Sequence, residues 1–394
     1  MGSGAPPTVL RDPLVVAAAL VAALIALLIG PVAFPAYTGN ADEPVYVLQA
    51  EALADGHLTL DAQQHGGPFR PWLTGEHEGR IYTQYQPGWP AAIAAASTVG
   101  SMALARALAA AGLVVAAAAL AEQVFADRRV RRTAAAATAA TPLFILHSFT
   151  WLSYSFSAAW LIGAAALFVR QARHPAPLTA TAAGAMLAGG LLIRPFDAVV
   201  VGVVLVLAAV VVGGRKVGRL VTTTVPYAAL GAAPAVLLTL SYNRYVTGDP
   251  FLFPLPASSP ENRFGFGLRE ILPGEPAVDY SFDTATDALF DNVSAIPTWT
   301  AFGGLAVVAA VVTLLDRSVG RRVRLMLGAG IVAFPAAYLF WWATALSAPG
   351  ARNGLGPHYY LPAVALLTVV AARGVVTLVE RARVQPQVAA TRLV

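Results

Sequence analysis

Apolar runs recur along the whole chain, and most of the polar segments between them are short. Runs of about 20 residues are long enough for a helix to cross a bilayer. Because a bilayer excludes open sheets, the pattern predicts an all-α polytopic membrane protein with about ten transmembrane helices in a single domain, residues 1–394. The expected spans are 13–35, 101–124, 133–148, 152–170, 178–193, 196–213, 219–242, 298–315, 325–346 and 358–379.

Two segments between the expected spans are much longer than the others, residues 36–100 and 243–297. Segments of this length in a compact protein are usually functional or disordered. Both are rich in aromatic residues, proline and glycine. We therefore expect them to be folded and to carry whatever chemistry the protein performs.

The first long segment contains the pattern of a short amphipathic helix. Val45, Leu48 and Ala52 recur at helical spacing, whereas Gln49 and Glu51 lie off that face. A proline at position 44 suits a first helical turn, and a glycine at position 56 suits a helix end. The pattern predicts a helix that lies at the outer membrane surface and starts near an acidic pair.

Composition supports the membrane interpretation. Of the 394 residues, 57% are hydrophobic and only 12% are charged, with a net charge of +5. A soluble domain carries about 25% charged residues. The basic residues are scattered through short segments and form no basic domain, so we expect no nucleic-acid partner. The absence of cysteine excludes disulfides and thiolate chemistry.

Basic segments follow alternate spans and share one face in the ten-span arrangement. They lie at 126–132, 170–175, 213–219, 316–324 and 380–383. The positive-inside rule makes that face cytoplasmic. We therefore expect a multi-pass plasma-membrane protein with both termini cytoplasmic, a cytoplasmic tail at 380–394, and both long, acidic segments on the outer face.

The acidic pair, Asp42 and Glu43, has two interpretations. Aspartate is a favoured N-cap, and acids in a first turn suit the helix dipole. A helix N-terminus also holds a carboxylate rigidly and in its ionised form, as a general base requires. Further along, "GRIYTQYQPGWPAAI" (79–93) forms a rigid aromatic entry to the next span, or simply an interfacial aromatic belt.

These motifs together resemble a known family. "DEPVYVLQAEALADGHL" followed by "GRIYTQYQPGWP" is similar to bacterial polyprenyl-phosphate-sugar-dependent glycosyltransferases of the GT-C superfamily. That superfamily includes protein O-mannosyltransferases and lipid A aminoarabinose transferases. The resemblance continues in order over residues 13–380, through "LLIRPFDAVVVG" (191–202), "YNRYVTGDPFLFP" (242–254), "NRFGFG" (262–267) and "GPHYYLPAVALL" (356–367).

The resemblance implies a function and a base. Such enzymes move a sugar from a polyprenyl-phosphate donor to an acceptor hydroxyl on the outer face, usually with inversion. The acceptor is a glycan, a lipid or a protein. The first acid of the pair, Asp42, would be the catalytic base, and Glu43 would position the acceptor or tune Asp42. No glycine-rich phosphate loop follows a strand, which disfavours a nucleotide-sugar donor.

The departing phosphate needs cationic or hydrogen-bonding groups. Arginines at span ends can also simply extend toward the interface. The candidates for the lipid phosphate are Arg194, Arg352, His358, Tyr359, Arg80 and Arg244. The candidates for other substrate contacts are Tyr46, Tyr82, Tyr85, Gln84 and Trp89.

The chain departs from the family in two respects. Relatives carry a lysine just before the Pro-Gly of "YQPGW", where this chain has Gln84 and Gln86. Large relatives also carry a soluble outer domain after the spans, so here the two long segments would recognise the substrates together with membrane lipids.

A metal site remains unassigned. No cofactor is required by the sequence, although some members of the superfamily use a divalent cation. His57 and His65 lie near Asp55 and Asp61, but their spacing matches no standard metal-binding cluster.

Two other classes of function remain open. A transporter or lipid flippase needs ionisable groups or broken helices near the bilayer midplane. The expected spans contain mainly Arg106 and Glu122, near the ends of the second span, which disfavours an ion-coupled path. In a non-enzymatic assembly factor, Asp42 would serve only as a helix cap.

Overall fold

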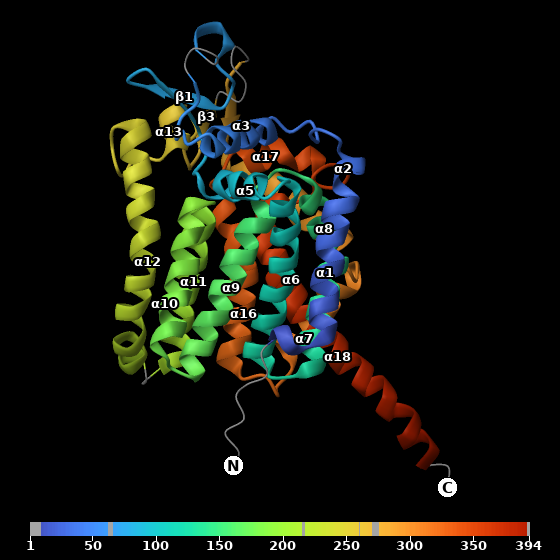
Figure 1. Cartoon of the computed structure of the whole chain (residues 1–394). Coiled ribbons are helices and arrows are strands. Elements are labelled where there is room, and N and C mark those ends of the chain that lie inside the picture. The colour runs from blue at the N-terminus through green and yellow to red at the C-terminus, as the bar shows by residue number, and fades with distance from the viewer. Residues whose placement is uncertain (1–8, 62–65, 215–216, 260, 270–275, 392–394) are drawn as a thin grey trace.

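The computed structural model describes residues 9–61, 66–214, 217–259, 261–269 and 276–391. Long helices run side by side, and a layer of short helices and strands covers one end of this bundle (Figure 1). The helices of the bundle are α1 (Pro13–Leu28), α2 (Gly30–Ala33), α6 (Ala103–Phe125), α7 (Arg128–Ala140), α8 (Pro142–Phe149), α9 (Tyr154–Arg173), α10 (Pro177–Gly189), α11 (Pro195–Gly213), α12 (Val217–Thr247), α15 (Gly304–Leu315), α16 (Arg321–Tyr338) and α18 (Leu361–Thr391).

The covering layer is built mainly from the two long segments, and residues 343–360 add α17 (Ala343–Ser347), η6 (Ala348–Gly350) and η7 (His358–Tyr360) to it. Strand β1 (Thr74–His77) pairs antiparallel with β2 (Arg80–Thr83) in the register Thr74↔Thr83. Strand β3 (Gly267–Arg269) pairs antiparallel with β4 (Val278–Tyr280) in the register Gly267↔Tyr280. The elements of this layer are α3 (Asp42–Ala54), β1 (Thr74–His77), β2 (Arg80–Thr83), α5 (Gly88–Thr98), α13 (Pro254–Ser258), β3 (Gly267–Arg269), β4 (Val278–Tyr280), α14 (Phe282–Ala295) and α17 (Ala343–Ser347). Short 3-10 turns complete it, η2 (Gly67–Phe69), η5 (Ile296–Trp299), η6 (Ala348–Gly350) and η7 (His358–Tyr360), and two more lie elsewhere, η1 (Val9–Arg11) and η3 (Gly190–Leu192).

The described part of the chain has six helices long and apolar enough to cross a membrane, or eight if each of two bent pairs forms one span. The predicted helical, polytopic class is therefore confirmed, although the described residues also form two two-stranded sheets, and the count of ten stays a prediction. The expected span 133–148 is divided at Thr141 between α7 and α8. The expected span 178–193 corresponds to a shorter apolar segment, Pro177–Leu192.

Two expected spans are bent where the pattern predicts continuous helices. The chain turns by 97° between Phe282–Trp299 and Gly304–Leu315, and by 99° between Arg321–Tyr338 and Ala343–Gly350. At the second bend the apolar pattern continues, so hydropathy alone does not report it. The first bend lies at the start of the span expected at 298–315, and α14 before it falls in the long segment 243–297. The bends carry α14 and α17 across the end of the bundle, beside the rest of the covering layer. The last helix, α18, continues beyond the span expected at 358–379 and ends at Thr391.

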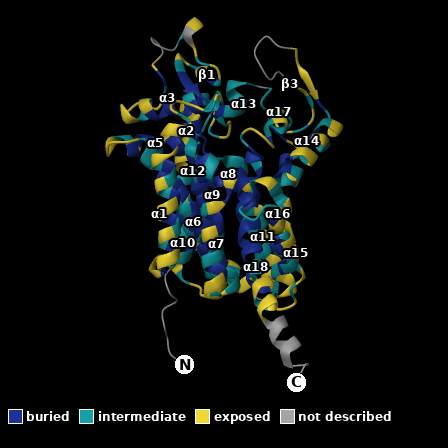
Figure 2. Cartoon of the chain, turned by 90° about the vertical axis from the view of Figure 1, so that its right-hand side faces the viewer, coloured by how far each residue is buried: buried dark blue, intermediate teal, exposed yellow. Residues whose placement is uncertain are grey.

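Small residues let the helices approach closely. A Cβ added at Gly184 would lie 2.0 Å from the carbonyl oxygen of Ala228, and one at Gly231 would lie 1.9 Å from that of Thr181. Helices α10 and α12 therefore touch backbone to backbone, the close packing expected where lipid gives no hydrophobic drive for association. Buried residues lie toward the inside of the bundle and exposed residues toward its outside (Figure 2). Many exposed side chains on α11 and α12 are valine or leucine, as a lipid-facing surface requires.

A buried ion cluster fastens α1 to α7 at the end of the bundle opposite α3. Asp12 is 5% exposed and accepts hydrogen bonds from Arg131 at 2.6 Å and Arg132 at 2.9 Å. It also caps α1 by accepting from the backbone of Leu14. The hydrogen bond from Arg132 is the main reason that the pKa of Asp12 lies well below its usual range. Because the folded pKa is lowered, this stabilisation is complete at neutral pH and would be lost only in strong acid.

We predict that Asp12→Asn lowers the free energy of unfolding by about 3 kcal/mol, because it leaves a buried arginine charge partly uncompensated. Thermal melting of the detergent-purified protein at pH 7 checks this. The exposed Asp287 on α14 provides the matched control, Asp287→Asn, which should melt like the wild type. Equal melting of Asp12→Asn and wild type would show that the cluster adds no stability.

Candidate functional site

Helix α3 begins at Asp42 but is not capped by it. The backbone N–H of Asp42 donates to the Oδ1 of Asn40 at 2.8 Å, so the asparagine closes the helix end. Pro44 occupies the first turn as expected. The predicted start near the acidic pair is confirmed. The N-cap position is Ala41, and the side chain of Asn40 satisfies the N–H of Asp42, so the carboxylate of Asp42 is available for other contacts.

Glu43 is fully buried and bound on several sides. Its carboxylate accepts a hydrogen bond from the backbone of Trp151 at 2.8 Å and from both the backbone and the hydroxyl of Thr38. The positive charge of Arg106 acts on it. The Arg106 guanidinium lies 4.0 Å from the ring centre of Trp151 and donates to the Phe149 carbonyl. Glu43 thus ties the start of α3 to the connection between α8 and α9.

The predicted orientation of α3 is wrong at Gln49. This residue was expected off the buried face, yet it is 2% exposed. Its amide donates to the Tyr242 hydroxyl at 2.9 Å and accepts from the Thr83 hydroxyl at 2.7 Å. A polar side chain can be buried here because both ends of its amide are satisfied. Helix α3 therefore packs against α5 and β2 across the end of the bundle (Figure 1) and is joined to α12 through the Gln49–Tyr242 hydrogen bond, so this face is covered by protein.

Asp42 lies beside the cation of Arg194. Burial raises the pKa of Asp42 above its ordinary value, while a hydrogen bond with Tyr85 and the charge of Arg194 oppose the rise. The negative charge of Glu43 adds to the rise. The carboxylate is thus held between one hydrogen-bond donor and one cation, and it remains partly exposed.

Arg194 directly precedes α11, where Pro195 suits the first helical position. Its Nε donates to Asp197 at 2.9 Å, and one Nη donates to the hydroxyl of Tyr338 at 3.1 Å. The guanidinium lies 4.0 Å from the ring centre of Tyr154 and 5.9 Å from that of Tyr359. The cation is thus held by an acid and enclosed by aromatic rings, and only 16% of its side chain is exposed.

His358 and Tyr359 belong to the same cluster. The His358 ring lies 4.5 Å from that of Tyr359 and 4.8 Å from that of Tyr154, between ring centres. On the other side, Tyr46 stacks on Tyr85 at 4.1 Å. The structure therefore brings together six residues that the sequence proposed separately: Asp42, Tyr46, Tyr85, Arg194, His358 and Tyr359.

Three cationic candidates lie outside this cluster. Arg352 donates to the hydroxyl of Ser294 at 3.0 Å on an exposed surface. Arg80 donates to the Tyr245 carbonyl at 2.7 Å and pairs with Glu78. Arg244 is exposed on α12. Each of these side chains has a surface position of the kind that snorkelling arginines adopt.

The remaining aromatic and amide candidates divide in the same way. Trp89 is 1% exposed in the core and donates to the Trp151 carbonyl. Tyr82 is buried against α12. Gln84 donates to the hydroxyl of Tyr85 at 2.9 Å and so reaches the cluster indirectly. Gln86 donates to Asn243 instead, at 2.8 Å.

Sequence reasoning missed three members of the cluster. Asp197 was visible in "RPFD", as an acid one helical turn after an arginine, and could have been proposed as its partner. Tyr154 and Tyr338 lie inside expected spans, on α9 and α16. Their position in an apolar pattern gave no sign that their rings meet a cation.

The described residues do not fit a metal ion. None of them form a group of three or more histidines and acids that could hold one. Hydrogen bonds engage both oxygens of Glu43. Asp42 therefore belongs to no metal-binding group among the described residues. His65 lies outside the described residues. We derive no chemical step through a metal.

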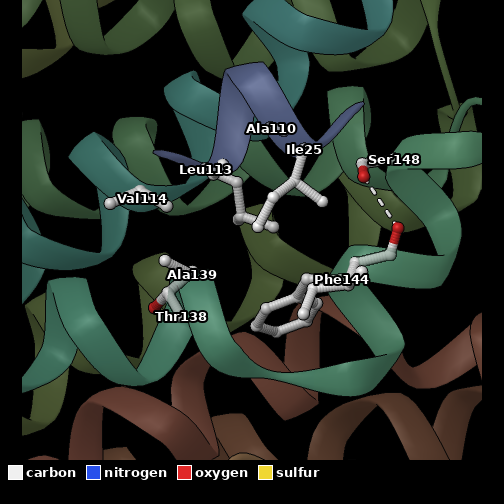
Figure 3. Close-up of a pocket in the computed structure, with 10 residues that line it drawn as sticks. Ile25, Ala110, Leu113, Val114, Thr138, Ala139, Phe144 and Ser148 are labelled. Carbon is white, nitrogen blue, oxygen red and sulfur yellow. Dashed lines mark hydrogen bonds between the residues drawn. The ribbon is translucent and has the colours of Figure 1, made fainter. Parts of the chain in front are cut away.

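A small apolar pocket lies elsewhere, between α1, α6, α7 and α8 (Figure 3). Ile25, Leu113 and Phe144 point into it. Its most polar members, Thr138 and Ser148, use their hydroxyls on backbone carbonyls. Since no titratable group lines it, we do not consider it a site of chemistry.

Comparison with known proteins gives a fold. No protein-family model matches the sequence, and no curated protein matches it. ArnT from Cupriavidus metallidurans bound to undecaprenyl phosphate shares 16% identity at a TM-score of 0.60, covering 92% of this chain and 59% of ArnT. The apo state of the same ArnT shares 15% identity at a TM-score of 0.56, covering 92% of this chain and 58% of ArnT. The Archaeoglobus fulgidus oligosaccharyltransferase in complex with Zn and sulfate shares 15% identity at a TM-score of 0.56, covering 91% of this chain and 48% of the oligosaccharyltransferase.

These likenesses confirm, at the level of the fold, the GT-C resemblance expected from the motifs. With the apolar helices, they identify a multi-pass membrane protein. The chain spans about half to three fifths of the length of these structures.

We predict that Glu43→Gln lowers the free energy of unfolding by about 1–3 kcal/mol, because a buried acceptor becomes a donor facing Thr38. Thermal unfolding followed by tryptophan fluorescence checks this. Glu51→Gln, on the exposed face of the same helix, is the matched control and should melt like the wild type. If both variants melt alike, Glu43 does not hold α3 in place.

Proposed function

We propose that the protein is a membrane glycosyltransferase that moves a sugar from a polyprenyl-phosphate donor to an acceptor hydroxyl. The observation that carries this proposal is the pairing of a partly exposed acid, Asp42, with an aromatic-enclosed cation, Arg194, at one end of a GT-C-like bundle. A hydroxyl acceptor needs a base, and a phosphate leaving group needs a cation.

The donor class is supported by the fold comparison and by the position of the cation. The similar ArnT structure contains undecaprenyl phosphate. Here Arg194 lies where the covering layer meets the spanning helices, at the start of α11. A lipid phosphate in the headgroup plane would meet it there. A guanidinium carries five N–H groups, so its two bonds to Asp197 and Tyr338 leave donors for phosphate oxygens.

The proposed step is a single displacement. The acceptor oxygen bonds to the anomeric carbon as the bond from that carbon to the phosphate oxygen breaks. The acceptor proton passes to the carboxylate of Asp42, and the electron pair of the broken bond leaves with the polyprenyl phosphate. Attack opposite the leaving group inverts the configuration. One carboxylate suffices, because a phosphate departs as an anion without an acid.

Arg194 would supply the charge that relatives take from a lysine before Pro-Gly. Neither glutamine offers a cation, and Gln86 is turned toward Asn243 on α12. Arg194 is present in the cluster together with His358 and Tyr359 as further donors. We therefore propose that these three residues bind the lipid phosphate and that the two long segments recognise the acceptor.

The proposed location follows from the charge pattern of the loops. The end with the covering layer would face outward and the end with Asp12 inward, in the plasma membrane. The termini would then be cytoplasmic and the active site would lie on the outer face. The acceptor would be a glycan, lipid or protein outside the cell.

Asp42→Asn should lower transfer about a thousandfold, because the base is lost. It should also melt at or above the wild-type temperature. Burial raises the pKa of Asp42, so its ionised form destabilises the fold at neutral pH, and asparagine removes that cost. The assay measures transfer from radiolabelled polyprenyl-phosphate sugars, extracted from membranes of cells grown on labelled glucose, into acceptors in the source membranes.

If the wild type transfers sugar and Asp42→Asn transfers it equally well, Asp42 is not the catalytic base. A lowered melting temperature would show instead that its charge stabilises the fold. No transfer by any protein, wild type included, would contradict the proposed enzyme and favour the transporter or assembly interpretations.

Arg194→Lys should lower transfer about 10–100-fold and raise the donor KM, because an ammonium lacks the planar fork that matches a phosphate. The charge opposite Asp197 is kept, so folding should be largely retained. Arg70→Lys, at an exposed arginine near Glu76, is the control and should leave both constants unchanged. Wild-type kinetics in Arg194→Lys would contradict a phosphate-binding role.

A further inference from the structure

Tyr85 lies along the buried face of α3. Asp42, Tyr46 and Gln49 are spaced i, i+4 and i+7, so they share one face of the helix. The carbonyl of Tyr85 accepts from Gln49 at 3.5 Å, its ring stacks on Tyr46 at 4.1 Å, and its hydroxyl bonds to Asp42. The side chain thus follows the helix from Gln49 to the acid.

The direction of the hydrogen bond at Tyr85 is set by its other partner. The amide of Gln84 donates to the Tyr85 oxygen at 2.9 Å. An amide nitrogen can only donate, so the phenol proton remains for the second partner. The other end of the Gln84 amide accepts from Asn262 at 3.4 Å, which orients it. Burial raises the pKa of Tyr85, so the phenol stays protonated and donates to Asp42.

The Tyr85 ring has little freedom to turn away. Tyr46, on which it stacks, is itself held by a hydrogen bond between its hydroxyl and that of Ser153 at 3.1 Å. The residue that follows in the chain, Gln86, is fixed to Asn243. The phenol is therefore presented to Asp42 by packing on one side and by amide contacts on the other.

We propose that Tyr85 is the positioning residue of Asp42, oriented by Gln84, and that it aims the carboxylate at the acceptor. This inference rests on the proposed function for its catalytic consequence, but not for its effect on Asp42. It replaces the direct substrate contact expected of Tyr85 and Gln84. Because Asn262 belongs to the second long segment, the two segments meet at the acid through this chain of side chains.

The electrostatic surroundings of Asp42 make the effect specific. Arg194 is the cation that acts on it, and Glu43 is the neighbouring acid. Three further tyrosines interact with its charge: Tyr46 on α3, Tyr154 on α9 and Tyr359 in η7. Removing the Tyr85 hydroxyl leaves the charge of Arg194 to oppose the effect of burial, so protonation of Asp42 becomes easier.

The first test does not depend on activity. The detergent-purified full chain is labelled with a hydrophobic carbodiimide, which reacts with protonated carboxyls, over a range of pH. Mass spectrometry then quantifies the Asp42 peptide, with Asp42→Asn as the blank. Tyr85→Phe should move the labelling midpoint about one pH unit higher. Gln84→Leu should move it in the same direction by less.

Tyr280→Phe is the matched control. Tyr280 lies on the second long segment, and the substitution removes a buried hydroxyl that donates to the Leu339 carbonyl at 2.9 Å. It should leave the midpoint unchanged. An unshifted midpoint in Tyr85→Phe, with a melting temperature like that of the control, would overturn the positioning role. A shift in Tyr85→Phe without one in Gln84→Leu would overturn the role of Gln84.

The second test uses transfer from the labelled polyprenyl-phosphate sugars. Tyr85→Phe should lower kcat about 10–100-fold, change the donor KM less than twofold, and move the acidic limb of the pH profile upward. A raised donor KM with unchanged kcat would contradict the positioning role and show instead that Tyr85 contacts the substrate directly. If the wild type transfers no sugar, the proposed function fails, while the labelling experiment still decides the positioning of Asp42.

Discussion

A buried positive charge at the end of the helix bundle has to be balanced, and the site is built around that requirement. Arg194 is enclosed by the rings of Tyr154 and Tyr359 and paired with Asp197 at 2.9 Å. Charges are removed from water only where partners replace it. The partners come from α9, α11, α16 and η7, so the arginine fastens four elements while it faces Asp42. Stability and the proposed chemistry thus rest on the same cation.

The acidic pair has divided roles because of helix geometry. Consecutive residues of a helix point about 100° apart. Asp42 therefore faces Arg194 and Tyr85, while Glu43 faces Trp151 and Thr38. Neither acid is the cap, because Ala41 holds the N-cap position and Asn40 accepts from the N–H of Asp42. The two acids would therefore affect stability in opposite directions. Burial raises the pKa of Asp42, so its ionised form lowers the stability of the fold, whereas the hydrogen bonds of the buried Glu43 raise it.

The bends of 97° and 99° explain how a chain with so few long helices covers its own site. They carry α14 and α17 over the end of the bundle, on the side away from α3 and α5 (Figure 2). Segments far apart in sequence then meet at this end of the bundle. A hydrogen bond such as that from Asn262 to Gln84 links the two long segments directly. Recognition of an acceptor by both segments would depend on this contact.

The sequence by itself determined the helical membrane class, most span positions, the start of α3 and the motifs that carry the fold resemblance. These follow from local rules: hydropathy, helical spacing and the residues allowed in a first turn. It also proposed Asp42, Arg194, His358 and Tyr359, because polar groups at span ends are conspicuous.

Only the tertiary structure decided which candidates meet. Arg352 and Arg80 were candidates for the lipid phosphate on the same grounds as Arg194, yet both lie on exposed surfaces. Gln49 was placed on the wrong face, and Tyr154 and Tyr338 were overlooked. Periodicity reports which residues share a face of one helix, whereas burial and charge balance depend on the neighbouring helices, and the sequence of one helix does not specify what packs against it.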